Sequence, residues 1–95
     1  MPSAIVYLNG RFVPESEAAI SPLDRGFLFG DAIYEVVRFF RGRAFHLEEH
    51  LARMQEGLAA LRIAADASFY PEVARELLRR NGLDEADAIV YTQVS

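Results

Sequence analysis

The chain has 95 residues, of which 52% are hydrophobic and 25% are charged, and its formal net charge is −4. This length and composition predict one globular domain with a modest core, and the negative charge argues against nucleic acid as a partner, because phosphates require concentrated basic groups. All 10 basic residues are arginines, and neither lysine nor cysteine occurs, so disulfides and thiolate metal sites are excluded.

The chain begins with a pattern typical of a β-hairpin. Residues 4–8 are mostly β-branched or aromatic, Asn9 and Gly10 tolerate positive φ angles, and residues 11–13 resume the strand pattern. Pro14 is expected to end the second strand, because proline has no N–H to donate to a ladder.

A second hairpin is predicted after an ordered loop at residues 21–31, which contains proline and two glycines among apolar side chains. Residues 32–40 form a nearly continuous apolar run, which predicts a strand buried on both faces. Arg41 and Gly42 would form the turn, and residues 43–46 would pair back in the antiparallel direction.

Two helices are expected next. One runs from about His46 to about Arg62, because apolar residues recur there at steps of three and four: Leu47, Leu51, Met54, Leu58 and Leu61. The second would have Ser68 as its N-cap, Pro71 in its first turn and a stop at Asn81-Gly82. Its inward side chains would be Val73, Leu77 and Leu78.

A final strand pattern covers residues 88–95 and continues to the last residue, as we expect of a truncated or split polypeptide. Strands, two helices and a returning strand predict an α+β domain, an antiparallel sheet with two helices packed on one face. Residues 1–95 are therefore read as a single domain. With no signal-like segment and no apolar run of membrane-spanning length, a soluble cytoplasmic protein is expected.

One short motif suggests a metal site. The segment from His46 to His50 matches H-x-x-E-H, an inverted zinc-peptidase pattern, and two histidines four apart share a helix face. However, no third ligand is indicated by the sequence. We therefore favour an ordinary role, in which both histidines cover the first helical turns while Glu48 and Glu49 complement the helix dipole.

The segment from Asp24 to Arg38 (DRGFLFGDAIYEVVR) is the most informative part of the sequence. It resembles the D-R-G-x-x-F-G-D-x-[YF]-E-x-x pattern of the fold-type IV pyridoxal-phosphate aminotransferases. The similarity continues through the Asn9-Gly10 hairpin, the H-x-x-R step from His50 to Arg53 and the closing residues 90–94. The chain is thus similar to the amino-terminal domain of that family, which includes D-amino-acid transaminases, branched-chain transaminases and aminodeoxychorismate lyases.

The resemblance implies roles for three residues. Arg53 occupies the position at which the family binds the cofactor phosphate, and a guanidinium is suited to that task because it forms bidentate, charge-assisted hydrogen bonds. Tyr34 matches an aromatic residue that lines the active site, and Val36 lies two residues further, on the same side of the strand. Both are expected to contact substrate. Read without the resemblance, Arg53 would be an exposed or salt-bridged arginine, and Tyr34 and Val36 would be core residues.

The implied cofactor is pyridoxal 5'-phosphate, and the implied partners are an amino acid and a 2-oxo acid. The tyrosine at position 34 favours the D-amino-acid branch, with a donor such as D-alanine. In the family, the lysine that binds the cofactor lies in a carboxy-terminal domain, and the parent enzyme is expected to be a homodimer. Without lysine, this chain alone is predicted to be inactive, and no catalytic residue is assigned in it.

Two alternatives stay open. The chain could be a stand-alone, non-catalytic binding or interaction module derived from the enzyme domain. It could also be a fragment of a branched-chain L-amino-acid transaminase or of an aminodeoxychorismate lyase.

Overall fold

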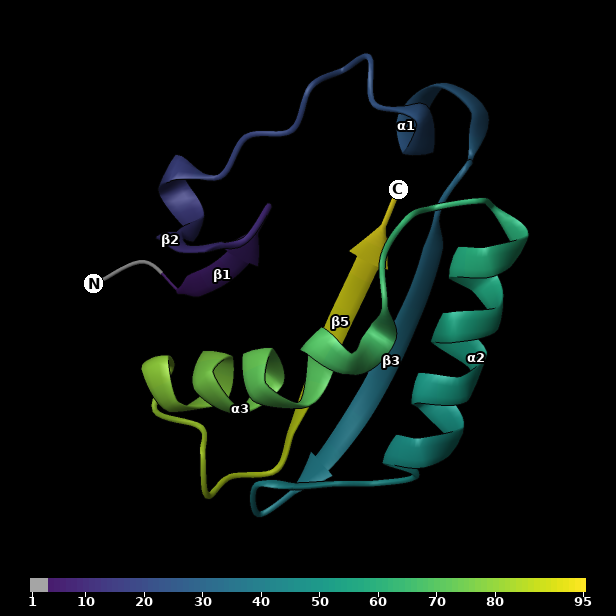
Figure 1. The fold of residues 1–95 in the computed structure, drawn as a ribbon. Helices are drawn as coiled ribbons and strands as arrows, with labels where there is room; N and C mark the ends of the chain where they lie inside the picture. The colour runs from purple at the N-terminus through teal and green to yellow at the C-terminus, as the bar shows by residue number, and fades with distance from the viewer. Residues whose placement is uncertain (1–3) are drawn as a thin grey trace.

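A computed structural model describes residues 4–95 and contains two antiparallel sheets with helices packed against them. The larger sheet has the order β4-β3-β5, and its strands are β3 (Ile33–Phe40), β4 (Arg43–Ala44) and β5 (Ala88–Val94). Helices α2 (Leu47–Ala60) and α3 (Tyr70–Arg80) cover one face of this sheet (Figure 1). The predicted α+β class, with two helices on one sheet face, is confirmed.

The first hairpin forms as predicted. Strands β1 (Ile5–Leu8) and β2 (Arg11–Pro14) pair in register, and the two turn residues Asn9 and Gly10 have φ angles of 50° and 85°. This hairpin does not join the larger sheet. It lies against α3 (Figure 1), where Asn81 exchanges two hydrogen bonds of 2.9 Å with the backbone of Ile5.

The segment between the hairpins is more regular than the sequence indicated. A 3-10 turn, η1 (Glu15–Glu17), follows β2, and the predicted loop at 21–31 contains a short helix, α1 (Arg25–Phe29). Asp24 caps α1 by accepting a hydrogen bond of 2.9 Å from the backbone N–H of Gly26, and the left-handed Gly30 ends it. The side chain of Arg25 binds Asp31 across the helix.

The strand pattern of β3 differs from the prediction in one respect. Its alternate residues are buried toward the helices, and the core contains Val37 and Phe39, whereas Tyr34, Val36 and Phe40 are exposed. The prediction that both faces are buried was therefore wrong for the described residues. The physical reason is that α2 and α3 cover only one face of the sheet. The apolar side chains of β3 that point to the other face are therefore exposed.

The second hairpin is shorter than expected. Only Phe39 and Phe40 pair with Ala44 and Arg43, after a turn with φ angles of 49° at Arg41 and 81° at Gly42. His46 then adopts a left-handed conformation with a φ of 56°, which ends the strand and begins α2.

Helix α2 buries Met54 and Leu58 against the sheet, while Leu47 and Leu51 pack at the edge of the core. The helix ends at Ala60, and Arg62 has a positive φ angle of 56°. Leu61, the last member of the predicted apolar stripe, therefore lies beyond the helix and is 37% exposed.

The start of α3 differs from the prediction. The α3 N-cap position is Phe69, which makes no side-chain cap bond, and the capping residue is Asp66 of the preceding turn, whose carboxylate accepts a hydrogen bond of 2.8 Å from the backbone N–H of Ser68. A 3-10 turn, η2 (Ala67–Phe69), comes first, and α3 begins at Tyr70. Its buried residues are spaced by four: Tyr70, Ala74 and Leu78. Leu77 packs beside them, so the predicted inward face was right for the two leucines and incomplete at Tyr70 and Ala74.

Strand β5 completes the sheet by pairing with β3 from Ile33↔Val94 to Phe39↔Ala88. This pairing places Val90 opposite Val37, both in the core, and Tyr91 opposite Val36 on the uncovered face. The core therefore forms between one sheet face and the two helices.

Candidate functional site

The predicted residues Tyr34 and Val36 lie on the uncovered face of β3. Their exposed fractions are 64% and 39%, and the ring of Tyr34 stacks on that of Tyr91 with a centroid separation of 5.8 Å. Neither residue is part of the core, so the alternative reading as core residues does not hold within residues 4–95. Both side chains are available to a partner or ligand on this face.

Glu35, between these two residues, points to the opposite face and is only 7% exposed. Its carboxylate accepts hydrogen bonds from Arg53 on α2, at 2.9 Å from Nε and 2.7 Å from Nη2. The Nδ1 atom of His50, one helical turn earlier, lies 2.6 Å from Glu35 Oε1. A buried strand carboxylate is thus held by two side chains of the facing helix.

In this cluster, Glu35 and Arg53 each shift the pKa of the other so that its charged form is favoured. The hydrogen bonds from the Arg53 side chain lower the pKa of Glu35 more than burial raises it, and the His50 side chain contributes in the same direction. Glu35 in turn raises the pKa of Arg53. Glu35 is therefore ionised near neutral pH. The short contact then requires His50 to carry its proton on Nδ1, which leaves Nε2 free of this bond.

The guanidinium of Arg53 keeps unused hydrogen-bonding capacity. Glu35 engages the Nε and Nη2 edge, while the Arg53 side chain is 66% exposed. Arginine has five N–H donors in a rigid fork, so the Nη1 group remains available to an anion. Because the buried carboxylate fixes one edge, the other edge is presented in a defined orientation. This geometry suits recognition of a phosphate group.

The structure does not bring all three predicted residues onto one surface. Side chains alternate along a strand, so Tyr34 and Val36 lie on the face opposite to Glu35 and its partner Arg53. The helix face that carries Arg53 also includes Gly57, one turn further along α2, and this part of the face is used for packing. A Cβ atom at Gly57 would lie 2.6 Å from Ile33 Cγ2, so this glycine permits close approach of α2 to β3 rather than contact with a ligand.

From the sequence, Glu35 was assigned no role, and His50 was assigned only that of covering the first helical turns. A signal for Glu35 was present, because it occupies the same strand parity as Ile33, Val37 and Phe39 and therefore had to be buried. An acidic side chain at such a position requires a cationic or N–H donor partner. The identity of that partner depends on how α2 packs against β3. The sequence pattern of the strand alone does not predict this packing.

The two histidines of the H-x-x-E-H segment face different carboxylates. His46 Nδ1 lies 3.6 Å from Glu49 Oε2 on the helix surface, whereas His50 faces Glu35 in the sheet. Across residues 4–95, no three side chains of the metal-binding types are grouped closely enough to hold an ion. In the same part of the chain, no helix has both the length and the apolar character needed to span a membrane.

Comparison with known proteins places the chain in a family. The profile of the amino-transferase class IV family matches residues 32–95, so the chain belongs to this family. Among curated relatives, it is 33% identical over 93 residues to the aminodeoxychorismate lyase of Bacillus subtilis, a match that covers 96% of this chain. It is 36% identical over 94 residues to the D-alanine aminotransferase of Staphylococcus haemolyticus, which covers 95% of this chain.

Solved structures agree on the fold. A branched-chain amino acid aminotransferase from T.th., solved with pyridoxamine 5'-phosphate, superposes with a TM-score of 0.82 at 28% identity, and 96% of this chain is covered. The branched-chain aminotransferase of Thermoproteus uzoniensis gives a TM-score of 0.75 at 26% identity and the same coverage. In both structures, and in the two curated relatives above, the match spans 32% of the other chain. The chain therefore corresponds to about a third of the length of these proteins.

Proposed function

We propose that residues 1–95 are the amino-terminal domain of a pyridoxal-phosphate-dependent transaminase. The complete protein would exchange an amino group between an amino acid, such as D-alanine, and a 2-oxo acid. The observation that carries the proposal is the exposed guanidinium of Arg53, fixed by the buried Glu35, in a chain that belongs to the class IV family. In this proposal a carboxy-terminal domain supplies the lysine, and the enzyme is a cytoplasmic homodimer.

Each proposed residue has a separate task. Arg53 would bind the cofactor phosphate through its free Nη1 edge, because Glu35 already holds the opposite edge. Tyr34 and Val36 would line the substrate side, where an aromatic ring and a branched side chain limit the size of the amino acid. When bound, pyridoxal phosphate acts as an electron sink that makes the α-proton of an amino acid removable. This chain holds no lysine to move that proton, so its contribution is binding and orientation.

The D-amino-acid preference is the finer part of the proposal. Its support is Tyr34 and the similarity to the D-alanine aminotransferase of Staphylococcus haemolyticus. The relatives also include a lyase and branched-chain enzymes, so the alternatives are a branched-chain L-amino-acid transaminase and an aminodeoxychorismate lyase. Activity of the complete protein with D-alanine, with L-valine or with aminodeoxychorismate as the substrate distinguishes the three.

The role of Arg53 is testable by cofactor binding. In the complete protein, Arg53→Gln should weaken pyridoxal 5'-phosphate binding by about tenfold or more, because a charge-assisted pair of hydrogen bonds to phosphate is lost. Arg53→Lys should restore binding only in part, since an ammonium group is a point charge without the fork that serves Glu35 and phosphate together. The measurement is the dissociation constant from absorbance or fluorescence titration of the apoenzyme.

Arg62→Gln is the matched control, because Arg62 follows the same helix and belongs to no described ion pair. It should bind the cofactor as the unsubstituted protein does. Unchanged cofactor affinity in Arg53→Gln would contradict the phosphate role. Absence of cofactor binding by the unsubstituted complete protein would favour the remaining alternative, a non-catalytic binding or interaction module.

A further inference from the structure

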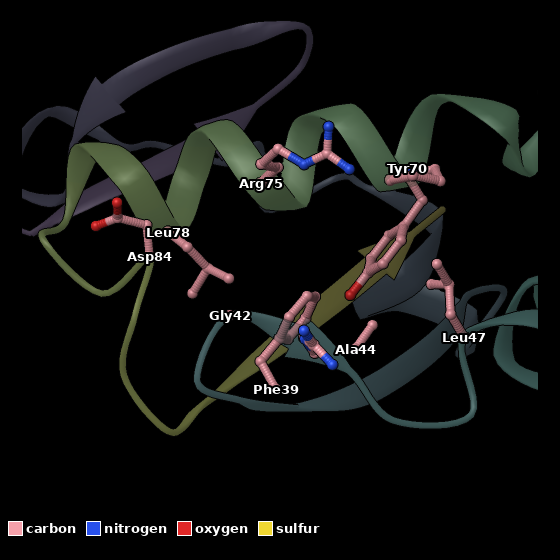
Figure 2. Close-up of a pocket in the computed structure, with 10 residues that line it drawn as sticks. Phe39, Gly42, Ala44, Leu47, Tyr70, Arg75, Leu78 and Asp84 are labelled. Carbon is pink, nitrogen blue, oxygen red and sulfur yellow. The ribbon is translucent and has the colours of Figure 1, made fainter.

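A cavity of about 340 Å³ lies where the starts of α2 and α3 meet the β3–β4 turn. Its walls include the apolar side chains of Phe39, Leu47 and Leu78. In Figure 2, Leu78 and Tyr70 reach down from α3 toward Phe39 and Ala44, which lie below the helix. The volume is at the lower end of the range found for ligand sites, so it fits a small molecule.

Two arginines on the cavity lining have no partner. Arg43 on β4 and Arg75 on α3 both line the cavity, and within residues 4–95 neither takes part in an ion pair or a side-chain hydrogen bond. By contrast, Arg79 and Arg80 on the same helix are both bound to Glu76. Asp84 is the one acidic residue of the lining and forms no ion pair with either arginine. The lining therefore carries a net positive charge.

The third feature is the hydroxyl group of Tyr70. This side chain is 2% exposed, lines the cavity, and its Oη atom makes no hydrogen bond to any described residue. Burial raises the pKa of Tyr70 to about 12, the approach of the Thr92 side chain to the hydroxyl, outside full hydrogen-bond geometry, lowers it, and the negative charge of Glu35 raises it. Buried hydroxyl groups are nearly always paired, so an unpaired one at a cavity marks a position where a ligand atom is expected.

We propose that this cavity binds a small monocarboxylate with an apolar body and one further polar atom. The carboxylate would be held by Arg43 and Arg75, the apolar body would cover Phe39, Leu47 and Leu78, and the polar atom would bond to Tyr70 Oη. A ligand of this kind satisfies all three features at once. An inorganic anion would leave the apolar wall and the hydroxyl unused, and a purely apolar molecule would leave the two arginines unused.

This cavity has a lining of its own, although its Tyr70 lies within electrostatic reach of Glu35 in the proposed cofactor site. Phe39 lies four residues beyond Glu35 on β3, which corresponds to roughly 13 Å along the strand. None of Tyr34, Val36 or Arg53 lines the cavity. The inference therefore goes beyond the proposed function and does not depend on it.

The test uses two probes that differ in one atom. 4-Hydroxyphenylacetate and phenylacetate would be titrated into the complete protein by isothermal calorimetry. We expect both to bind in a saturable manner and the hydroxylated probe to bind more tightly. The double variant Arg43→Gln/Arg75→Gln should weaken both by about tenfold or more, because the charge-assisted hydrogen bonds to the carboxylate are lost. Arg11→Gln, on β2 and away from the cavity, should leave both unchanged.

Tyr70→Phe separates ligand binding from folding. It should remove the advantage of the hydroxylated probe while preserving phenylacetate binding, and its midpoint of thermal unfolding should be unchanged or higher, since an unpaired buried hydroxyl is removed. Absence of saturable binding would overturn the proposal. Binding that persists in the double arginine variant, or that is lost in Arg53→Gln instead, would place the probes elsewhere and would also overturn it.

Discussion

At the scale of single residues, the ion pair between Glu35 and Arg53 links the sheet to α2 and presents a guanidinium to solvent. The two partners differ in exposure, 7% for Glu35 and 66% for Arg53. Removing the arginine would leave a buried carboxylate without its main donor, whereas removing the carboxylate would leave an exposed cation in water. The two partners therefore differ in importance. The ionised carboxylate of the buried Glu35 holds the exposed Arg53 guanidinium in a fixed orientation.

The protonation of Glu35 should make stability depend on pH. Its pKa in the folded protein is below the ordinary value of 4.5, so the folded state binds fewer protons than the unfolded state in acid. The stabilisation is therefore fully present above about pH 4.5 and is lost as the pH falls toward the lowered pKa. Chemical unfolding between pH 7 and pH 3 should show this loss in the unsubstituted protein.

Glu35→Gln is the corresponding variant. It keeps the shape of the side chain but removes the charge, and we expect unfolding at pH 7 to become easier by about 1 to 3 kcal/mol. The acid-dependent part of the stability assigned to Glu35 should disappear at the same time. Glu49→Gln is a suitable control, because Glu49 is 72% exposed at the side chain and makes only a long contact to His46. An equal pH profile in Glu35→Gln and the unsubstituted protein would contradict the assignment.

At the scale of the elements, two side chains attach the first hairpin to α3: the Arg80 guanidinium lies 4.4 Å from the centroid of the Phe12 ring, and Asn81 binds the backbone of Ile5. Asn81 accepts a hydrogen bond from the Ile5 N–H and donates one to the Ile5 carbonyl, in addition to its bond of 2.8 Å to Leu77 O. An asparagine amide used in this way resembles a strand partner, because it presents an acceptor and a donor side by side. The C-cap of α3 therefore also fixes the position of β1.

Asn81→Ala should loosen the hairpin more than the rest of the fold. The half-buried backbone groups of Ile5 lose their partners, which should cost about 1 to 3 kcal/mol. Hydrogen exchange should accelerate in β1 and β2 while the amides of β3 and β5 keep most of their protection. Asn81→Asp should loosen the hairpin to a similar or greater extent. Its carboxylate still accepts a hydrogen bond from Ile5 N–H, but it has no N–H to donate to the Ile5 carbonyl, and the two oxygens repel each other. Uniform acceleration across the whole chain would contradict a separate role for Asn81.

The elements also show what the sequence could and could not predict. The Asn9-Gly10 hairpin and the apolar stripe of α2 are local patterns, and both were predicted with nearly correct limits. The start of α3 was missed, because Asp66 and Ser68 are both good caps, and Asp66 caps the 3-10 turn η2 that precedes α3. For the site, the motif assigned a role to Arg53, but its contact with Glu35 joins residues 18 apart in two elements. Sequence periodicity within one element therefore cannot predict this contact.

At the scale of the whole molecule, the uncovered face of the larger sheet is its most unusual surface. Its large apolar side chains are Tyr34, Val36, Phe40, Ile89 and Tyr91, with exposed fractions from 39% to 64%. Apolar patches of this extent on a small domain mark surfaces that contact other protein or a ligand. The proposed substrate residues Tyr34 and Val36 belong to this face, so the proposed function provides a reason for it to remain uncovered by α2 and α3.

The last prediction concerns residues 1–95 produced alone. The uncovered face should then drive concentration-dependent self-association, visible in light scattering coupled to size-exclusion chromatography. Replacing two of its residues that are not in the proposed site, with Phe40→Thr and Ile89→Thr, should shift the protein toward monomer while threonine keeps the strand propensity of both positions. Val37→Thr would be a poor control, since Val37 is fully buried, so Leu83→Thr on the α3–β5 connection serves instead. A stable, concentration-independent monomer without any substitution would show that this face needs no partner, and would favour the stand-alone module over the transaminase domain.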